Sequence, residues 1–476
     1  MPELSSTITD YINSVYGNDF AKEYTAFTAK PASSYLRLSP FWNDKNDLLN
    51  QLKAYGVELV GVPKLQDTYK VITGNEIIGK TIEFIMGAYY IQSLSSMIPP
   101  LILSPNENEI VLDLCAAPGS KTTQLGEMMN NKGVLIANEP GADRLKMLVH
   151  NIDKTGLINA GVTQTRGEWL SRFYNNYFDK ILVDAPCSAL GVVHKKGEVS
   201  NWWSEERVDL LSRLQLMLIS SAIKMVKVGG EIVYSTCTLT PEENELIINH
   251  IVKKYPVEIL DIDLPVESIN ALQSYKEERL DEDIIKGRRI LPWQIDSDGF
   301  FIIKLKKNDE IEPSKPENVK PNNALIVDST NKQIKNHLQN ISDNYGIENS
   351  AWVNFKFIIK GTDINFINAG WNDERLLMYN RVGTKFGTFD KYGNVFLHSF
   401  ATQILKDSIK ENIFEITDIK DLKTYLAGGT IKTSVDKKIH KVVKYKNMIL
   451  GVAAAVENGL KSQFPKSKRM NEVSFY

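Results

Sequence analysis

Between residues 108 and 305 of this 476-residue chain, apolar runs alternate with stretches of helical pattern. The apolar runs predict buried strands over 109–115, 133–139, 160–165, 178–187 and 229–238. The segments between them predict helices over 120–131, 142–156, 208–226 and 243–255. Strands that alternate with helices in this way are typical of the α/β class and favour a parallel, doubly wound sheet.

The remainder of the chain divides around this block. Residues 306–323, "KKNDEIEPSKPENVKPNN", combine three prolines with charged residues and almost no apolar content, which predicts a linker. Residues 1–104 mix helical patterns with short strands, and we expect them to form an N-terminal α+β cap. A central domain over 105–305 and a C-terminal domain over 324–476 complete the prediction.

Composition places the chain among globular proteins, with 43% hydrophobic and 24% charged residues. The longest apolar runs are too short for a membrane span, and the N-terminus lacks the basic and apolar regions of a secretory signal. We therefore expect a cytoplasmic protein without a membrane partner. Its three cysteines, Cys115, Cys187 and Cys237, neither form a disulfide framework nor supply a CxxC pair, so we expect no metal site.

The net charge of −2 does not decide for or against a nucleic-acid partner, but charge is unevenly distributed. Between Ile431 and Met470 there are ten lysines and arginines and two acidic residues. Such an excess is of the kind that contacts phosphates, although a solvated face near the chain end would give the same pattern.

The segment "IVLDLCAAPGSKTTQL" ends like a phosphate-binding loop, but Leu114 stands where the first glycine of that motif belongs. A nucleotide kinase is therefore not expected. The other ligand of doubly wound sheets is a nucleoside-containing cofactor, which the small residues Ala116, Ala117 and Gly119 would let approach the backbone. Glu139 ends the next strand, where an acid that binds a ribose is expected. This spacing alone does not separate a dinucleotide from S-adenosylmethionine.

Two cysteines follow buried strands directly. Cys187 closes "ILVDAPC" and Cys237 lies in "IVYSTCT", so both are expected at the edge of the sheet that faces the cofactor. Asp184 stands three residues before Cys187. Two thiols, an acid and a cofactor at one edge suit nucleophilic catalysis on an electrophilic ring. The positions of the two cysteines in the sequence do not decide which of them is the nucleophile.

Four segments, "DLCAAPGSKTTQ", "DAPCS", "STCTLTPEENE" and "DGFFIIKL", resemble the signature segments of the NOL1/NOP2/Sun family of RNA 5-methylcytosine methyltransferases. The length, the linker, "NRVGTKFGTF" and "GVAAAVENGLKSQFPKS" resemble its bacterial small-subunit rRNA branch. The resemblance implies a Rossmann-like methyltransferase domain followed by a PUA-like RNA-binding domain. It also implies S-adenosylmethionine as cofactor and an RNA substrate, with small-subunit rRNA favoured and tRNA as the alternative. We expect a monomer.

The resemblance also implies roles for individual residues. Cys237 matches the family's nucleophile, which adds to carbon-6 of cytosine, and Cys187 matches the cysteine that helps release the product. Asp184 suits a hydrogen bond to ring nitrogen-3, and Lys121 is expected to support the cofactor pocket and Asp184. Cys115 is interpreted as packing beneath the first loop. The residues expected around the cofactor are Cys115, Ala116, Ala117, Pro118, Gly119, Ser120, Lys121, Glu139, Arg144, Arg166 and Asp184.

The sequence departs from the family pattern at two positions of interest. Arg166-Gly167 stands where the family has Asp-Gly, and Ala189 replaces the first glycine after the "PCS" segment. These changes motivate a rival hypothesis, a non-catalytic RNA-binding assembly factor on the same scaffold. The joint presence of Lys121, Asp184 and the two cysteines argues against it, since a scaffold needs none of them.

Overall fold

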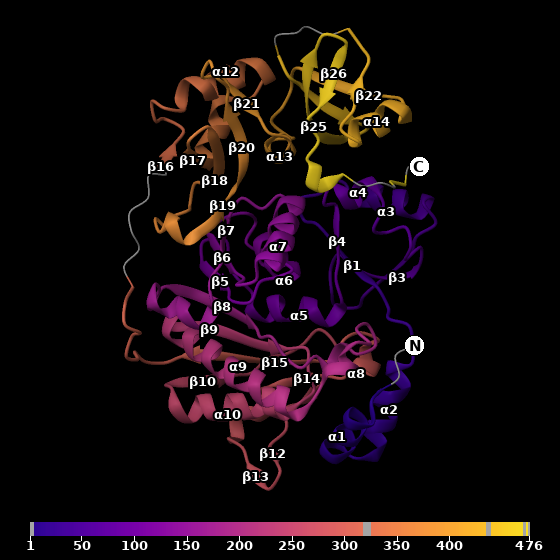
Figure 1. Cartoon of the computed structure of the whole chain (residues 1–476), viewed down its shortest axis with the longest axis vertical. Helices are drawn as coiled ribbons and strands as arrows, with labels where there is room; N and C mark the ends of the chain where they lie inside the picture. Colours follow the sequence, from indigo (N-terminus) through magenta and orange to yellow (C-terminus); the bar gives the residue numbers. More distant parts are fainter. Residues whose placement is uncertain (1–3, 318–324, 435–438, 470–472, 475–476) are drawn as a thin grey trace.

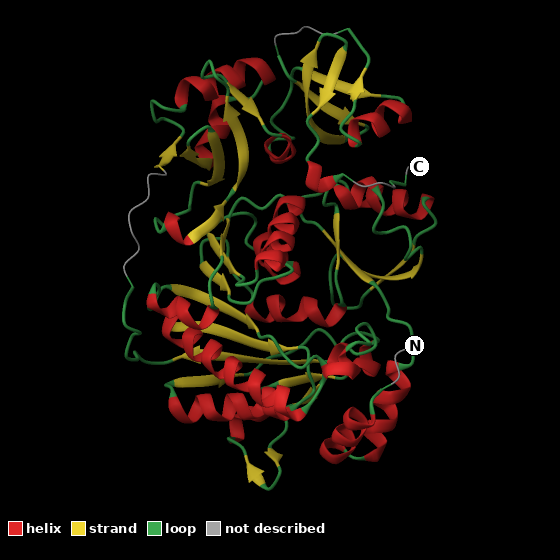
Figure 2. Cartoon of the chain, viewed as in Figure 1, coloured by secondary structure: helices red, strands yellow, loops and turns green. Residues whose placement is uncertain are grey.

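The computed structural model describes residues 4–317, 325–434, 439–469 and 473–474 (Figures 1 and 2). At its centre is a ten-stranded sheet. Five parallel strands form the middle of this sheet: β5 (Ile110–Asp113), β6 (Val134–Asn138), β7 (Ala160–Thr163), β8 (Phe178–Asp184) and β9 (Val226–Thr236). They lie in the order β7-β6-β5-β8-β9, so the chain reverses direction across the sheet between β5 and β8.

The four helices that the sequence predicted in this region are present. They are α6 (Ser120–Met128), α7 (Ala142–Thr155), α9 (Glu205–Met225) and α10 (Glu245–Lys254), and a short helix that was not predicted, α8 (Val199–Trp202), precedes α9. Helix α7 ends at Gly156, whose φ of 72° supplies the left-handed cap that a glycine adopts without strain. The side chain of Ser204 caps α9 by accepting from the backbone N–H of Arg207.

The predicted parallel sheet is found in the five central strands, but antiparallel strands that were not predicted extend both of its edges. Beyond β9 lie β15 (Phe300–Lys307), β14 (Arg288–Ile290), β11 (Ile269–Asn270) and β10 (Val257–Leu260). At the other edge, β19 (Tyr379–Val382) of the C-terminal part pairs with β7. Antiparallel strands need no crossover helix, so these short strands lack the strand–helix rhythm by which the parallel ones were predicted. A separate hairpin, β12 (Ser274–Tyr275) and β13 (Glu278–Arg279), and the short helix α11 (Pro292–Ile295) complete this part.

The N-terminal residues form two units. Helices α1 (Ser6–Tyr16) and α2 (Asn18–Thr28) pack on the loop that follows β8, in a cluster with Leu190 and Val193. The second unit is an antiparallel sheet of β2 (Glu58–Gly61), β3 (Thr68–Thr73), β1 (Tyr35–Leu38) and β4 (Tyr89–Ile91), with α3 (Lys45–Ala54) and α4 (Ile82–Ile85). Helix α5 (Leu94–Leu103) then packs against α6, β8 and β9.

The C-terminal part contains two further sheets of five strands each. The first comprises β16 (Leu325–Asp328), β17 (Phe355–Lys360), β18 (Asp363–Asn368), β20 (Thr384–Phe389) and β21 (Val395–Leu397), with α12 (Lys335–Tyr345) and α13 (Ser399–Ile404). The second comprises β22 (Ile413–Ile416), β24 (Lys441–Tyr445), β25 (Met448–Val456), β26 (Gly459–Ser462) and β23 (Thr430–Ile431), with α14 (Ile419–Leu426). Both lie above α7 and α4 in Figure 1.

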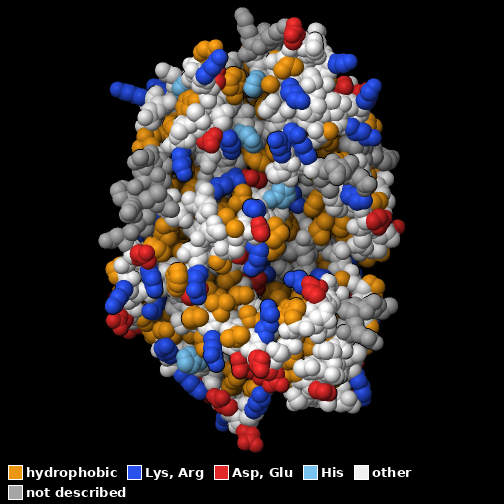
Figure 3. Space-filling view, in the orientation of Figure 1, with side chains coloured by type: hydrophobic (Ala, Val, Ile, Leu, Met, Phe, Trp, Pro, Cys, Tyr) orange, Lys and Arg blue, Asp and Glu red, His pale blue; other side chains and the backbone are white. Residues whose placement is uncertain are grey.

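The expected linker follows the end of β15, which continues to Lys307, and residues 318–323 of it lie outside the described residues. Lys437 and Lys438 of the basic C-terminal stretch also lie outside them. In the space-filling view, basic side chains are spread over the upper part of the molecule, which the two C-terminal sheets and their helices form. Acidic side chains gather at the opposite end (Figure 3). Among the described residues, no helix is both long and apolar enough to cross a membrane.

Candidate active site

The two catalytic candidates among the cysteines meet at the ends of neighbouring strands. Cys187 follows β8 and Cys237 follows β9, and the parallel register pairs Asp184 with Ser235 just before them. Their sulfur atoms lie 3.2 Å apart. The hydrogen bond with Cys237, together with burial, raises the pKa of the Cys187 thiol well above its usual value. The Cys187 thiol is therefore held protonated at neutral pH.

Asp184 and Lys121 form an ion pair beside these thiols. Lys121, in the first turn of α6, places its Nζ 2.7 Å from Oδ2 of Asp184 and also donates to Oγ of Ser96 at 2.9 Å. The hydroxyl of Ser235 donates to the other oxygen, Oδ1, at 2.8 Å. Both carboxylate oxygens are therefore held from different elements, while the side chain of Asp184 stays 26% exposed and faces the open edge of the sheet.

The loop between β5 and α6 brings backbone close to α7. Gly119 caps α6 with a φ of +111°, and a Cβ there would come within 3.2 Å of Leu148. This position requires glycine for both its conformation and its close contact. Beneath the loop, Thr122 donates to Asp113 at 2.7 Å, and burial raises the pKa of Asp113 to about 7. Burial also raises the pKa of the Cys115 thiol, which packs against the central core.

Glu139 lies at the end of β6, where the sequence placed the ribose-binding acid. Its Oε1 accepts the backbone N–H of Gly141 at 2.8 Å, and its Oε2 lies 3.4 Å from Arg144. Arg144 in turn donates to the carbonyl of Ala117 at 2.6 Å. The half-exposed guanidinium of Arg144 thus joins the loops after β5 and β6. Ala116, Ala117 and Pro118 lie on the first of these loops, and Ser120 begins α6.

Arg166 lies just beyond β7, and its side chain contacts residues that follow it closely in the sequence. Its guanidinium pairs with Glu168 at 2.5 Å and stacks over the Trp169 ring at 4.6 Å. Glu168, two residues after Arg166, is thus bound to Arg166. Within the described ranges, no three histidine, cysteine, aspartate or glutamate side chains are grouped so as to hold a metal ion.

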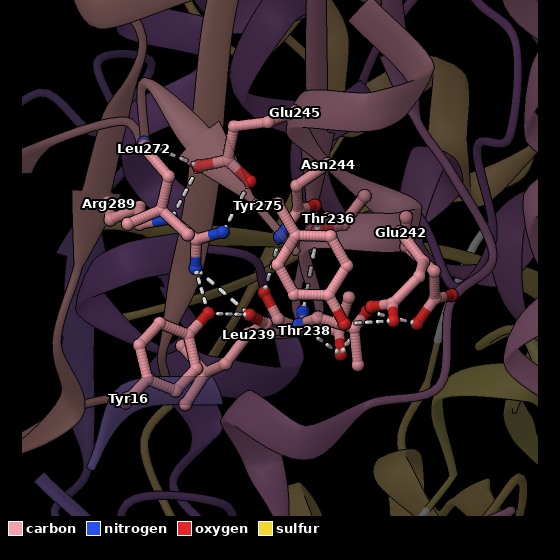
Figure 4. A network of polar contacts seen from close by, with 12 residues as sticks. Tyr16, Thr236, Thr238, Leu239, Glu242, Asn244, Glu245, Leu272, Tyr275 and Arg289 are labelled. Carbon is pink, nitrogen blue, oxygen red and sulfur yellow. Dashed lines mark hydrogen bonds and ion pairs between the residues drawn. The ribbon is translucent and has the colours of Figure 1, made fainter. Parts of the chain in front are cut away.

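Sequence reasoning missed the residues that hold the Cys237 loop (Figure 4). The side chain of Asn244 binds on both sides of Cys237: it accepts from the Thr236 hydroxyl at 2.6 Å and donates to the Thr238 carbonyl at 3.1 Å. The segment "TPEENE" was among the family segments, but Asn244 was assigned only to the start of a helix. The amide fixes the loop on either side of the thiol.

Glu243 joins the two cysteine loops. Its carboxylate accepts the backbone N–H of Ser188 at 2.9 Å and the hydroxyl of Thr240 at 2.7 Å. Ser188 and Thr238 also share a hydrogen bond of 2.8 Å between their hydroxyls. The loop after Cys187 and the loop after Cys237 are therefore linked to each other by side-chain hydrogen bonds.

A buried ion pair supports the same loop from behind (Figure 4). Arg289 of β14 binds Glu245 of α10 through two nitrogens, and both side chains are almost completely buried. Arg289 also donates to the Leu239 carbonyl at 2.9 Å, which Tyr16 of α1 binds through its hydroxyl. The N-terminal helices thereby contact the segment two residues beyond Cys237.

Ala189, which replaces the family's glycine, adopts a left-handed conformation with φ of 63°. An alanine in this region costs about 1–2 kcal/mol, which accounts for the family's preference for glycine there. Nearby, Gly191 donates to the Cys237 carbonyl at 2.9 Å. Ala189 thus adopts the left-handed conformation that a glycine takes up without strain.

The region that carries these residues is similar to known proteins. The family model described as 16S rRNA methyltransferase RsmB/F matches residues 100–306. The ribosomal RNA small subunit methyltransferase F of Shewanella oneidensis is 30% identical over 493 residues, covering 99% of this chain and 98% of the relative. The tRNA (cytosine(49)-C(5))-methyltransferase of Pyrococcus abyssi is 34% identical over 290 residues, covering 61% of this chain and 93% of the relative.

A solved structure supports the Rossmann-like methyltransferase fold. A methyltransferase homologue from Pyrococcus horikoshii superposes with a TM-score of 0.57 at 31% identity, covering 64% of this chain and 95% of its own. The resemblance seen in the four sequence segments is confirmed by these matches, which extend over nearly the whole chain. The chain belongs to the RsmB/F family of 16S rRNA methyltransferases, within the NOL1/NOP2/Sun group.

Proposed function

We propose that this chain forms 5-methylcytosine in small-subunit rRNA, with S-adenosylmethionine as methyl donor and a covalent cysteine–cytosine adduct as intermediate. The observation that carries the proposal is the pair of thiols 3.2 Å apart, next to the Lys121–Asp184 ion pair. Membership of a family of RNA methyltransferases supports the reaction class. The geometry supports the use of a thiol as nucleophile.

The residues around the first loop fit the proposed cofactor. Gly119 turns the first loop into the N-terminus of α6 and lets it pack closely on α7, and the buried Glu139 carboxylate ends the adjacent strand. One oxygen of Asp113, buried below this loop, has no hydrogen-bond partner among the described residues. Bound there, S-adenosylmethionine supplies an electrophilic methyl group. The same loop, Glu139, Arg144 and Arg166 would hold it.

The proposed chemistry begins at Cys237. Carbon-5 of cytosine is a poor nucleophile until a thiolate adds to carbon-6, so the Cys237 sulfur forms a bond to carbon-6 while Asp184 hydrogen-bonds nitrogen-3. Carbon-5 would then take the methyl group that S-adenosylmethionine supplies, which leaves S-adenosylhomocysteine. Loss of the carbon-5 proton to solvent would expel the Cys237 thiolate and break the carbon–sulfur bond. Cys187, whose raised pKa keeps it protonated, is suited to assist release rather than to attack.

The choice of rRNA over tRNA rests on coverage. The small-subunit rRNA relative matches the chain from end to end, whereas the tRNA relative covers 61% of it. We propose that residues 324–476 form a PUA-like RNA-binding domain, that 1–104 and 105–305 form the cap and catalytic domain, and that 306–323 link them. The target base must be unpaired or flipped to reach Cys237. We further propose a cytoplasmic monomer.

Transfer of a radiolabelled methyl group tests the proposal. Purified protein and labelled S-adenosylmethionine are incubated with unmethylated small subunits, naked small-subunit rRNA and tRNA in parallel, and the RNA is digested to nucleosides. We expect labelled 5-methylcytidine from small-subunit RNA. Label in tRNA alone would overturn the substrate assignment, and rRNA binding without any label would favour the assembly-factor hypothesis.

A further inference from the structure

The two thiols of the active site are placed for a reaction with each other. The Sγ atoms of Cys187 and Cys237 lie 3.2 Å apart, and both residues are partly exposed at the edge of the sheet. A disulfide holds its sulfur atoms about 2.05 Å apart, so these two atoms need to approach by about 1 Å. The third cysteine, Cys115, packs against the central core beneath the first loop. Cys187 and Cys237 are therefore the thiols that can be joined without a large movement of the backbone.

Contacts between the two cysteine loops keep the sulfur atoms together. The backbone N–H of Gly191 donates to the carbonyl of Cys237 at 2.9 Å. The hydroxyls of Ser188 and Thr238 share a hydrogen bond of 2.8 Å, and the Glu243 carboxylate accepts the backbone N–H of Ser188 at 2.9 Å. These bonds fix the main chain of one loop against the other. Holding two reacting groups in place in this way raises the effective concentration of one thiol at the other.

A small oxidant can reach this edge of the sheet. The side chain of Asp184, beside the thiols, is 26% exposed, and both cysteines are partly exposed. The proposed reaction also requires the same edge to admit a cytosine base, which is larger than hydrogen peroxide. Oxidation of a cysteine follows its thiolate character and its exposure. Cys237, the proposed nucleophile, is therefore the expected first target of a peroxide.

We propose that Cys187 and Cys237 form a reversible disulfide when the enzyme meets a peroxide, and that this bond switches methyl transfer off. The Cys237 thiolate attacks one oxygen of hydrogen peroxide, the oxygen–oxygen bond breaks, hydroxide leaves, and Cys237 becomes a sulfenic acid. The Cys187 sulfur then bonds to the Cys237 sulfur while the sulfur–oxygen bond breaks. The Cys187 proton leaves with the expelled hydroxyl group as water. The two thiols thus give two electrons to one peroxide, and a thiol reductant reverses the bond by thiol–disulfide exchange.

The two cysteines differ in a way that suits the two steps. The hydrogen bond with Cys237, then burial and the charge of Cys237, raise the pKa of the Cys187 thiol. A sulfenic acid at Cys237 no longer carries that charge, so Cys187 ionises more readily once it has a sulfenic acid to attack. The disulfide occupies both the proposed nucleophile and the proposed release group, which stops methyl transfer. That loss of activity rests on the proposed function, whereas formation of the disulfide does not.

The test treats the purified full-length protein with hydrogen peroxide in the absence of RNA, blocks the remaining thiols by alkylation, and identifies the products by peptide mass spectrometry before and after dithiothreitol. We expect a peptide pair joined through Cys187 and Cys237. Methyl transfer to small-subunit RNA should fall about tenfold or more and return with dithiothreitol. Cys115→Ala is the matched control and should form the same disulfide. In Cys187→Ser, peroxide should carry Cys237 on to a sulfinic acid that dithiothreitol does not reverse.

The outcomes separate this inference from the proposed function. A sulfinic acid at Cys237 of the wild type without any disulfide overturns the inference and leaves the proposed function standing, as does a disulfide through Cys115 or the absence of any reaction with peroxide. A Cys187–Cys237 disulfide in a protein that transfers no methyl group even before oxidation supports the disulfide and overturns the proposed function. Undiminished transfer by the fully disulfide-bonded protein overturns both the switch and the role of Cys237 as nucleophile.

Discussion

The sulfur atoms of Cys187 and Cys237 lie 3.2 Å apart although fifty residues separate them in the chain. Their proximity follows from the parallel pairing of β8 and β9, which brings the ends of both strands to one edge of the sheet. Only one of the two thiols is required as nucleophile. We predict that Cys237→Ala abolishes methyl transfer while binding of S-adenosylmethionine persists, as equilibrium binding of labelled cofactor would check. Residual transfer at more than about 1% of wild type would contradict the role of Cys237.

Asn244 provides a test of how the nucleophile is positioned. In Asn244→Ala the hydroxyl of Thr236 and the carbonyl of Thr238 lose their partner, which costs about 1–3 kcal/mol for each buried group left unpaired. We expect the free energy of unfolding to fall by a few kcal/mol and transfer to fall at least tenfold, measured as kcat at saturating cofactor.

Asn249→Ala is the matched control for that variant. Asn249 lies one turn further along α10 and bridges Glu278 and the backbone of Asp281, away from the cysteines. Its loss should destabilise the protein without a comparable loss of kcat. Equal losses of kcat in both variants would show that Asn244 acts only through stability.

The Lys121–Asp184 ion pair predicts a strong effect on rate. Lys121→Met leaves Asp184 with the Ser235 hydroxyl and without its cationic partner. Loss of one preorganised electrostatic contact at a reacting centre costs about 100-fold or more in kcat, which initial-rate measurements would detect. The control is Lys180→Met. Lys180 lies on the same strand as Asp184, β8, but near the opposite end of that strand, where it pairs with Glu109 and Glu231, so this variant should retain the wild-type rate. A Lys121→Met enzyme of normal rate would show that Asp184 does not depend on this lysine.

Asp113 predicts a dependence of stability on pH. Burial raises its pKa from an ordinary 3.8 to about 7, so between these values the folded protein holds a proton that the unfolded chain has released. The stabilising contribution is fully present below pH 3.8 and is lost as pH rises through 7. The Asp113→Asn variant lacks this contribution, because a side-chain amide does not titrate. The free energy of unfolding of the wild type, relative to Asp113→Asn, should therefore decrease between pH 5 and pH 8 in denaturant titrations; a constant difference would contradict the assignment.

The parallel half of the sheet and its chemistry could be predicted from sequence. Apolar runs fixed the positions of β5 to β9, and Cys187 and Cys237 followed two of them, so their meeting at one edge was expected. The antiparallel strands were not predicted, because β14 and β11 are short and β19 joins β7 from a distant part of the chain. No local sequence pattern predicts that these two strands pair.

The supporting residues were missed for a related reason. Asn244 and Glu243 read locally as the beginning of a helix, and their function depends on partners in two other loops. Lys154 and Lys468 are far apart in the chain, and both are buried in the fold. Each carries an ordinary surface pattern in sequence, and only the fold reveals that both are buried.

Trapping of the covalent intermediate tests the central claim most directly. Cys187→Ala is incubated with S-adenosylmethionine and unmethylated small-subunit rRNA, and the products are separated on denaturing gels and digested for mass spectrometry. The account predicts an RNA adduct that survives denaturation and maps to Cys237, because release is impaired while attack is not. It also predicts no adduct in the Cys187→Ala, Cys237→Ala double variant. An adduct on Cys187 in the Cys237→Ala variant, with none on Cys237 in Cys187→Ala, would contradict it.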